Sequence, residues 1–216
     1  SPTPGCVAAM IGAGNFAKAV HLPNLKKLSD LYHLRAVVSA TGFNAKTTAQ
    51  QFGADYASTD YQDIVNDPDV DAVLICTRHD RHAPMVLQAL QAGKHILVEK
   101  PLAMNQEELA EIQNCSIRHP GSVLLTGFNR RFSPHIQRVK EIIEKRKSPM
   151  IINYRMNAGY IPLDHWVHGP EGGGRNIGEA SHVYDLFTFL TNSKYTQVAT
   201  QGIRPQTEYY SSQDNF

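Results

Sequence analysis

Apolar and polar positions alternate in two ways along the first 126 residues of the chain. Short, nearly continuous apolar runs predict strands at residues 6–11, 34–38, 56–57, 71–76, 95–98 and 122–126. Between them, apolar residues recur at helical spacing and predict helices at residues 15–28, 44–52, 60–66, 81–92 and 105–118. Apolar strands separated by helices are typical of a parallel sheet covered on both faces. The pattern therefore predicts an α/β fold with a doubly wound, Rossmann-type sheet over residues 6–128, after a linker or added tail at residues 1–5.

The pattern changes after residue 130. Helical spacing predicts helices at residues 133–146 and 177–191, and apolar runs predict strands at residues 150–154 and 195–203. A long loop rich in Gly, Pro and His separates the first of these strands from the second helix. Because one or two strands cannot form a stable sheet alone, we expect residues 129–216 to be an incomplete α+β substrate or oligomerisation domain, either truncated or completed by residues outside this sequence.

A glycine-rich turn joins the first predicted strand to the first predicted helix. Gly12, Gly14, Asn15 and Phe16 lie in the sequence Gly-Ala-Gly-Asn-Phe-Ala, which fits the pattern G-x-G-x-x-A. The first glycine permits the tight turn, and the second lets a pyrophosphate approach the backbone amides at the helix start. Its place directly after an N-terminal strand favours dinucleotide binding over a glycine turn without a ligand.

The end of the second predicted strand lacks the acid that commonly binds the adenosine ribose of NAD. Ser39 and Thr41 stand there instead, and Lys46 follows in the next helix. A small hydroxyl leaves room for a 2′-phosphate, so NAD or NADP are both candidates, with a slight preference for NADP. The alternative for Ser39 is an ordinary solvated loop residue.

Glu99, Lys100 and Pro101 end the strand predicted at residues 95–98. Ligands of open α/β sheets bind at the carboxyl ends of the strands, so this is the edge where a nicotinamide would lie. A positive nicotinamide would favour the neutral form of Lys100, which suits proton exchange with an alcohol. Taken alone, Lys100 is better explained as a solvated surface lysine at a strand end. The bond between Lys100 and Pro101 is a candidate for the cis form.

Composition limits the classes of partner and location. The formal net charge is +1, which gives no basic excess for nucleic acid. No apolar stretch approaches the roughly 20 residues that span a bilayer, and no signal peptide pattern opens the sequence. Three widely spaced cysteines favour free thiols in a reducing compartment, and hence the cytoplasm. The histidine pairs His79/His82 and His165/His168 lack the further ligands of a zinc signature, so no metal is expected.

Several segments occur in a fixed order: residues 12–17, 71–82, 92–101, 127–132 and 172–185. Together they resemble the Gfo/Idh/MocA family, named for glucose–fructose oxidoreductase and inositol dehydrogenase. The resemblance covers nearly the whole chain from residue 6. Residues 77–82 and 179–182 are also similar to a subset in which this module is fused behind a zinc-type alcohol dehydrogenase.

The resemblance implies a role for each matching residue. Lys100 matches the family's catalytic lysine, and His182 matches its active-site histidine. Positions that line the nicotinamide end of the cofactor, or approach cofactor and substrate, correspond to Thr77, Glu99, Pro101, Asn129 and Arg130.

The sequence departs from the family before His182. Typical members carry an aspartate four residues before this histidine, where this chain has Gly178, and Glu179 follows one residue later. On a helix Glu179 and His182 are neighbours, so Glu179 would orient the imidazole or hold a substrate hydroxyl. The alternative is an acid stabilised by the helix dipole in the first turn. Tyr160, His165 and Trp166, in the long loop, are expected to line the substrate pocket.

The predicted function is hydride transfer between a nicotinamide and a hydroxyl-bearing carbon of a sugar or polyol-like substrate. The catalytic residues would be Lys100, His182 and Glu179. The resemblance also implies homo-oligomers formed through the second domain. Two alternatives remain open: a glycosidase that uses tightly held NAD, and a non-catalytic dinucleotide-binding sensor.

Overall fold

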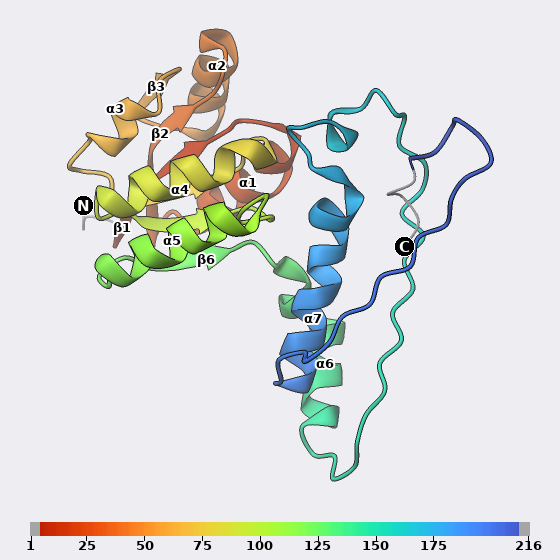
Figure 1. Cartoon of the computed structure of the whole chain (residues 1–216). Coiled ribbons are helices and arrows are strands. Elements are labelled where there is room, and N and C mark those ends of the chain that lie inside the picture. The colour runs from red at the N-terminus through yellow and green to blue at the C-terminus, as the bar shows by residue number, and fades with distance from the viewer. Residues whose placement is uncertain (1–4, 212–216) are drawn as a thin grey trace. The chain divides into compact units, whose positions relative to one another are not determined.

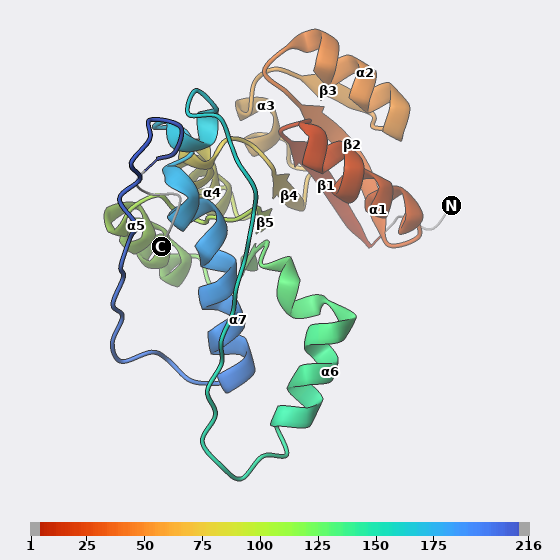
Figure 2. The same cartoon turned by 90° about the vertical axis from the view of Figure 1, so that its right-hand side faces the viewer.

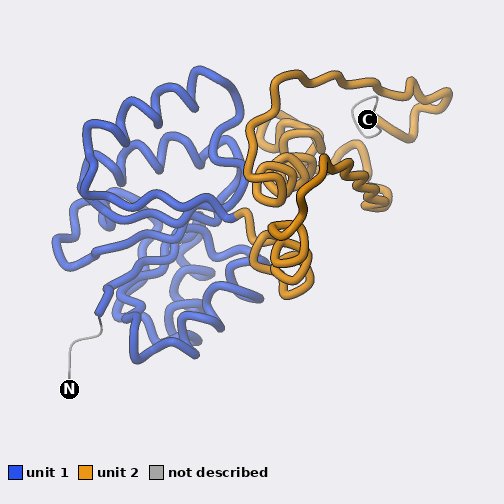
Figure 3. The backbone as a smooth tube through the Cα atoms, turned by 90° about the horizontal axis from the view of Figure 1, so that it is seen from below, with its two compact units in different colours: residues 1–127 blue, residues 128–216 orange. Residues whose placement is uncertain are grey.

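The computed structural model describes residues 5–211, which fall into two compact units. The first unit extends to Gly127 and the second begins at Phe128 (Figure 3). The predicted tail at residues 1–5 lies outside the described residues, apart from Gly5. None of the helices within residues 5–211 combines the length and the apolar character needed to cross a bilayer.

A parallel sheet forms the centre of the first unit (Figure 1). Its strands are β1 (Cys6–Ile11), β2 (Tyr32–Val38), β3 (Tyr56–Ser58), β4 (Ala72–Ile75), β5 (His95–Val98) and β6 (Leu124–Thr126). They are ordered β3-β2-β1-β4-β5-β6, and every neighbouring pair is parallel. This is the Rossmann order, in which the chain reverses direction across the sheet between β1 and β4.

Helices cover both faces of this sheet (Figures 1 and 2). They are a π-helical turn (Ala17–His21) that continues into α1 (Leu22–Lys27), then α2 (Gly42–Phe52), α3 (Gln62–Val65), α4 (His82–Gln91) and α5 (Gln106–Arg118). Successive β1 residues point to opposite faces, so Ile11 packs with α3, α4 and α5, while Met10 packs with α1 and α2. The predicted α/β Rossmann fold is confirmed.

Local capping fixes where the longest of these helices begins. The Asn105 side chain accepts a hydrogen bond from the Glu108 amide at 2.8 Å, and the Glu108 carboxylate accepts one from the Met104 amide at 2.8 Å. These reciprocal bonds satisfy amides that have no partner inside the helix, as in a capping box. The polar residues before residue 106 therefore determine where α5 begins, and α5 is the helix that connects β5 to β6.

The second unit is helical among the described residues. It contains a 3-10 turn (Asn129–Phe132), α6 (Pro134–Ile143), a second 3-10 turn (Trp166–His168), a π-helical turn (Asn176–Ala180) and α7 (Ser181–Thr191). The strands predicted at residues 150–154 and 195–203 do not form, and both segments lack regular structure. An isolated strand leaves its ladder groups unpaired, and the second unit's described residues give neither segment a strand partner.

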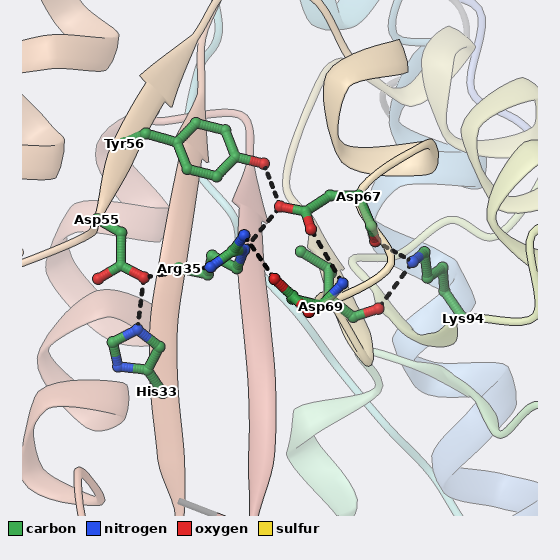
Figure 4. Close-up of polar contacts among 8 residues, drawn as sticks. His33, Arg35, Asp55, Tyr56, Asp67, Asp69 and Lys94 are labelled. Carbon is green, nitrogen blue, oxygen red and sulfur yellow. Dashed lines mark hydrogen bonds and ion pairs between the residues drawn. The ribbon is translucent and has the colours of Figure 1, made fainter. Parts of the chain in front are cut away.

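A charged network lies on the amino-terminal side of the first unit's sheet (Figure 4). It joins His33, Arg35, Asp55, Tyr56, Asp67, Asp69 and Lys94. The guanidinium of Arg35 donates to Asp67 at 2.7 Å and to Asp69 at 2.9 Å, and it holds the pKa of Asp67 below its ordinary value. Buried Lys94 donates to the carbonyls of Asp67 and Val70 at 2.6 and 2.8 Å. The network therefore ties the segment before β4 to β2 and β5.

Replacing Lys94 with methionine should lower the free energy of unfolding by about 2–4 kcal/mol, because two carbonyls lose their shared buried donor. Urea unfolding measures this change. Lys27, an exposed lysine of α1, offers a matched control, and K27M should change stability by less than about 0.5 kcal/mol. Equal stabilities of the two variants would contradict a structural role for the network.

Candidate active site

The glycine turn after β1 has the geometry that close backbone approach requires. Gly12 has φ +93°, and a Cβ on it would lie 2.6 Å from the carbonyl oxygen of Cys76. Gly12 therefore lets β1 and β4 meet at the point where the sheet order reverses. A Cβ on Gly14 would meet nothing within 4 Å, and Asn15 and Phe16 are exposed. The turn thus presents open space at the start of a helix, which suits a pyrophosphate.

Ser39 is buried at the end of β2, and its hydroxyl is already engaged. The side-chain nitrogen Nδ2 of Asn44 donates to the Ser39 hydroxyl at 2.7 Å and to the Ala13 carbonyl at 3.0 Å. The ammonium of Lys18 donates to the Asn44 side-chain oxygen at 2.5 Å. Lys18 and Asn44 thus join the glycine turn to this strand end, a role that sequence spacing alone did not indicate. Lys46 is exposed on α2.

The Glu99 carboxylate is largely shielded at the carboxyl end of β5. It pairs with Nε2 of His21 at 2.7 Å, and the two side chains are 14% and 17% exposed. A Cβ on Gly127 would come within 2.8 Å of this carboxylate, so glycine at that position leaves room for it. Burial raises the pKa of the nearby Cys76 thiol to about 12, and the charge of Glu99 adds to the effect. Cys76 therefore stays protonated and unreactive near neutral pH.

Lys100 and Pro101 are joined by a cis peptide bond, as the sequence suggested. The carbonyl of Pro101 accepts a hydrogen bond from Nδ1 of His82 at 2.7 Å, while Nε2 of His82 lies 3.2 Å from the Thr77 carbonyl. His82 is 1% exposed, so it links the loop after β4 to the turn after β5. Thr77 is half-buried there, and its methyl group lies beside Gly12. The predicted residues Gly12, Thr77, Lys100 and Pro101 thus belong to adjoining strand ends.

Burial lowers the pKa of His82 below its ordinary value of 6.5, because it penalises the imidazolium. The unfolded chain then takes up this proton at a higher pH than the folded protein does. The stability that neutral His82 contributes is therefore complete above about pH 6.5 and is lost as the pH falls toward the lowered pKa.

Urea unfolding between pH 7.5 and pH 5 should show this loss in the native protein, at about 1.4 kcal/mol for each tenfold by which folding weakens proton binding to His82. Replacing His82 with glutamine removes the titration, so the difference in stability between native protein and H82Q should shrink as the pH falls. A difference that stays constant across this range would contradict a neutral, buried His82.

Arg130 is the centre of a polar cluster in the second unit. Its guanidinium donates to the Tyr154 hydroxyl at 2.9 Å and lies 3.5 Å from the Glu179 carboxylate. Its nitrogens also contact the sulfur of Met156 at 3.6 and 3.7 Å. Two predicted site residues, Arg130 and Glu179, are thus brought together. Arg130 draws the segment at residues 154–156 to the same place.

His182 is buried on α7, where its ring meets that of Phe128 edge-on at 6.0 Å. One turn further along α7, the buried Asp185 carboxylate pairs with the guanidinium of Arg131. Neither residue belongs to the apolar stripe that helical spacing predicts for this segment, which consists of Ile177, Ala180, Val183, Leu186, Phe187 and Leu190, yet both are buried. The 3-10 turn beginning at Asn129, itself exposed, packs against this second face of α7.

The predicted site residues of the long loop differ in how far they are buried. Trp166 is half-buried and lies against the ring of His165 at 5.8 Å, whereas Tyr160 is 59% exposed. A Cβ on Gly172 would come within 2.5 Å of Val167, so the glycine run packs tightly on this loop. Buried Arg175, missed by the sequence reasoning, donates to the Gly159 carbonyl at 2.7 Å.

Two further features of the described residues bear on the site. A cavity of about 830 Å³ lies between α7 and residues 193–200, and none of the predicted site residues lines it. Among residues 5–211, no group of three or more His, Cys, Asp or Glu side chains is arranged to hold a metal ion.

Comparison with known proteins gives a consistent set of similarities. The sequence profile of an oxidoreductase family with an NAD-binding Rossmann fold matches residues 7–127. The uncharacterized oxidoreductase YrbE of Bacillus subtilis is 30% identical over 198 residues, which cover 91% of this chain and 57% of YrbE. Myo-inositol 2-dehydrogenase of Thermotoga maritima is 29% identical over 197 residues, which cover 89% of this chain and 57% of that enzyme.

Solved structures extend the similarity beyond the first unit. A levoglucosan dehydrogenase, in complex with NADH and levoglucosan, superposes with a TM-score of 0.73 at 27% identity. The match covers 86% of this chain and 54% of that protein. The chain thus spans little more than half the length of the relatives it matches.

Proposed function

Because this chain belongs to the Gfo/Idh/MocA family of NAD-binding oxidoreductases, we propose that it binds NAD(P) and serves in the oxidation or reduction of a sugar or polyol-like substrate. The observation that carries the proposal is the turn at Gly12 and Gly14. It lies at the reversal point of a sheet ordered 3-2-1-4-5-6, with open space above Gly14.

The residues at the carboxyl edge fit the two halves of a dinucleotide. The ends of β1, β2 and β3 would take the adenosine half, and the ends of β4, β5 and β6 the nicotinamide half. Gly12, Gly14, Asn15 and Phe16 would hold the pyrophosphate, with Ser39 near the ribose. Around the nicotinamide, the proposed residues are Thr77, Glu99, Pro101 and Asn129. When bound, NAD(P) supplies the hydride acceptor or donor.

Lys100 is the proposed acid–base residue of this chain. Its amine would take the proton from the substrate hydroxyl during oxidation and return it during reduction. We propose that His182 holds or exchanges a proton at the same hydroxyl, and that Glu179 positions the polar groups around it. Arg130, Tyr160, His165 and Trp166 would bind the rest of the substrate.

Cofactor choice follows from the end of β2. The structure places the ammonium of Lys18 in the network around Ser39, and no acid follows β2. A positive group and a small hydroxyl suit a 2′-phosphate better than they suit a bare ribose diol. We therefore favour NADP over NAD.

Relatives support the substrate class. One is a myo-inositol 2-dehydrogenase, and another was solved with levoglucosan, so both names point to compounds rich in hydroxyl groups. Exposed apolar side chains of the second unit, such as Phe132 and Ile142, support assembly through that unit. Homo-oligomers and a cytoplasmic location remain predictions.

A panel of sugars and polyols tests the proposal. The protein is incubated with each compound and either NAD⁺ or NADP⁺, and reduced nicotinamide is followed by its absorbance. We expect at least one compound to yield reduced cofactor and the corresponding ketone. Hydrolysis of a glycoside without net reduction of the cofactor would point to a glycosidase, and cofactor binding without turnover on any compound would point to a sensor. Either result would contradict the proposed dehydrogenase.

A further inference from the structure

Two histidines hold the turn that carries Lys100, one on each side of it. His82 donates to the carbonyl of Pro101, which follows Lys100, at 2.7 Å. His21 binds the carboxylate of Glu99, which precedes Lys100, also at 2.7 Å. His82 comes from α4, beside β4 and β5 in the sheet. His21 comes from the helix that begins at the glycine turn, on the other side of the reversal point.

His21 is itself held from the side of the glycine turn. It is the last residue of the π-helical turn Ala17–His21, and its ring meets that of Phe16 edge-on at 5.3 Å. Phe16 belongs to the glycine turn proper. A continuous chain of contacts therefore runs from the pyrophosphate turn through Phe16 and His21 to Glu99, the residue before Lys100.

The Glu99 carboxylate has little freedom to adopt another position. It lies against Gly127, where even a Cβ would come within 2.8–2.9 Å of its carboxylate atoms. The backbone amide of Glu99 donates to the Ile75 carbonyl at 2.9 Å. Because both members of the His21–Glu99 pair are mostly shielded from water, this hydrogen bond is less weakened by solvent than a surface pair would be.

We propose that His21 is a positioning residue, which couples the grip of the glycine turn on the pyrophosphate to the placement of Glu99 and Lys100 at the nicotinamide half. This inference rests on the proposed function. It assigns a role to a residue outside the glycine pattern and outside the Glu-Lys-Pro turn. Loss of His21 would leave the adenosine half bound as before and would disturb the nicotinamide half.

ADP-ribose separates these two halves, because it contains the adenosine, the pyrophosphate and a ribose but no nicotinamide. Calorimetry compares its affinity with those of NADH and NADPH for the native protein, H21L and H21Q. H21L removes the hydrogen bond to Glu99, whereas the amide of H21Q reaches about as far as Nε2 of histidine. His33 supplies the matched control, since it pairs with Asp55 at the same 2.7 Å distance at the amino-terminal end of β2.

In H21L we expect the affinity for the tighter-binding reduced coenzyme to fall about tenfold, while the affinity for ADP-ribose changes less than about twofold. H21Q should restore most of the coenzyme affinity, and H33L should change neither affinity. If H21L does not fold, H21N makes the same comparison, because its amide is too short to reach Glu99.

Unchanged coenzyme affinity in H21L, or in H21N where it takes its place, would overturn the proposal. An equal loss of coenzyme and ADP-ribose affinity would also overturn it, because His21 would then only support the turn. Failure of the native protein to bind either coenzyme is a different result, since it would contradict the proposed function itself.

Discussion

Replacing Gly12 with alanine is expected to abolish measurable binding of NADH and NADPH and to destabilise the first unit by roughly 2–5 kcal/mol. The added Cβ would lie 2.6 Å from the Cys76 carbonyl oxygen and 2.7 Å from its carbon. These are backbone atoms of the loop after β4, so they cannot move aside as the end of a flexible side chain can. The φ of +93° adds strain of its own, because side chains rarely adopt it.

Gly14 provides the comparison within the same turn. Its φ is not positive, and a Cβ there meets no atom within 4 Å, so G14A should fold with nearly native stability. It should still weaken coenzyme binding about 10- to 100-fold, because the methyl group occupies the space proposed for the pyrophosphate. Urea unfolding and calorimetry measure the two effects separately. Native coenzyme affinity in G14A would show that the ligand does not approach this turn.

Replacing Lys100 with methionine should reduce turnover on a substrate found in the sugar panel by about 10²–10⁴-fold, the usual contribution of a general acid–base residue. Methionine is similar in length and lacks the ionisable amine, so the turn before the cis proline should keep its shape. Coenzyme affinity should change less than about threefold. Steady-state kinetics gives kcat and KM for the substrate, and calorimetry gives the affinity for the coenzyme.

An exposed lysine elsewhere in the first unit tests whether the loss of turnover is specific to Lys100. Lys27 lies on the surface of α1, and K27M removes the same charge without touching the Glu-Lys-Pro turn. We expect K27M to keep native kcat. Undiminished kcat in K100M would remove Lys100 from the chemistry, and an equal decrease in both variants would trace the effect to the change in net charge.

The fold of the first unit could be predicted because its signals are local. Each strand is an apolar run and each helix has its own spacing, so even the short strand β3 is marked by Tyr56 and Ala57. The glycine turn could be placed for the same reason, since the pattern G-x-G-x-x-A is contained in six consecutive residues, although the Cys76 carbonyl that excludes a Cβ at Gly12 is distant in the sequence. The described helices begin and end within a few residues of their predicted bounds, apart from α6, where the prediction ran on to residue 146.

The strands predicted in the second unit do not form, because strand formation depends on partners outside the segment itself. Residues 150–154 and 195–203 have the apolar character of strands, but a strand needs a neighbour to satisfy its backbone groups. No signal inside a segment reveals whether such a neighbour exists. The burial of Asp185 was missed for a related reason, because its partner Arg131 is 54 residues away in the sequence.

Contacts within the site were harder to foresee than its residue types. Glu99, Lys100 and Pro101 were identified from their place at a strand end. His21, which binds Glu99, and His82, which binds the Pro101 carbonyl, lie 78 and 19 residues from these partners. Asn44 is a further example, because its side chain bonds to both Ala13 and Ser39. These residues look like ordinary helix positions in the sequence, and only the meeting of strand ends at one edge of the sheet gives them a role.

Calorimetric titration of the folded protein with NADH and with NADPH tests the central claim most directly. We predict saturable binding of one coenzyme molecule per chain, with Kd on the order of 1–100 μM, tighter for NADPH, and lost in G12A. Absence of heat for both coenzymes, from protein whose cooperative unfolding shows that it is folded, would contradict the account.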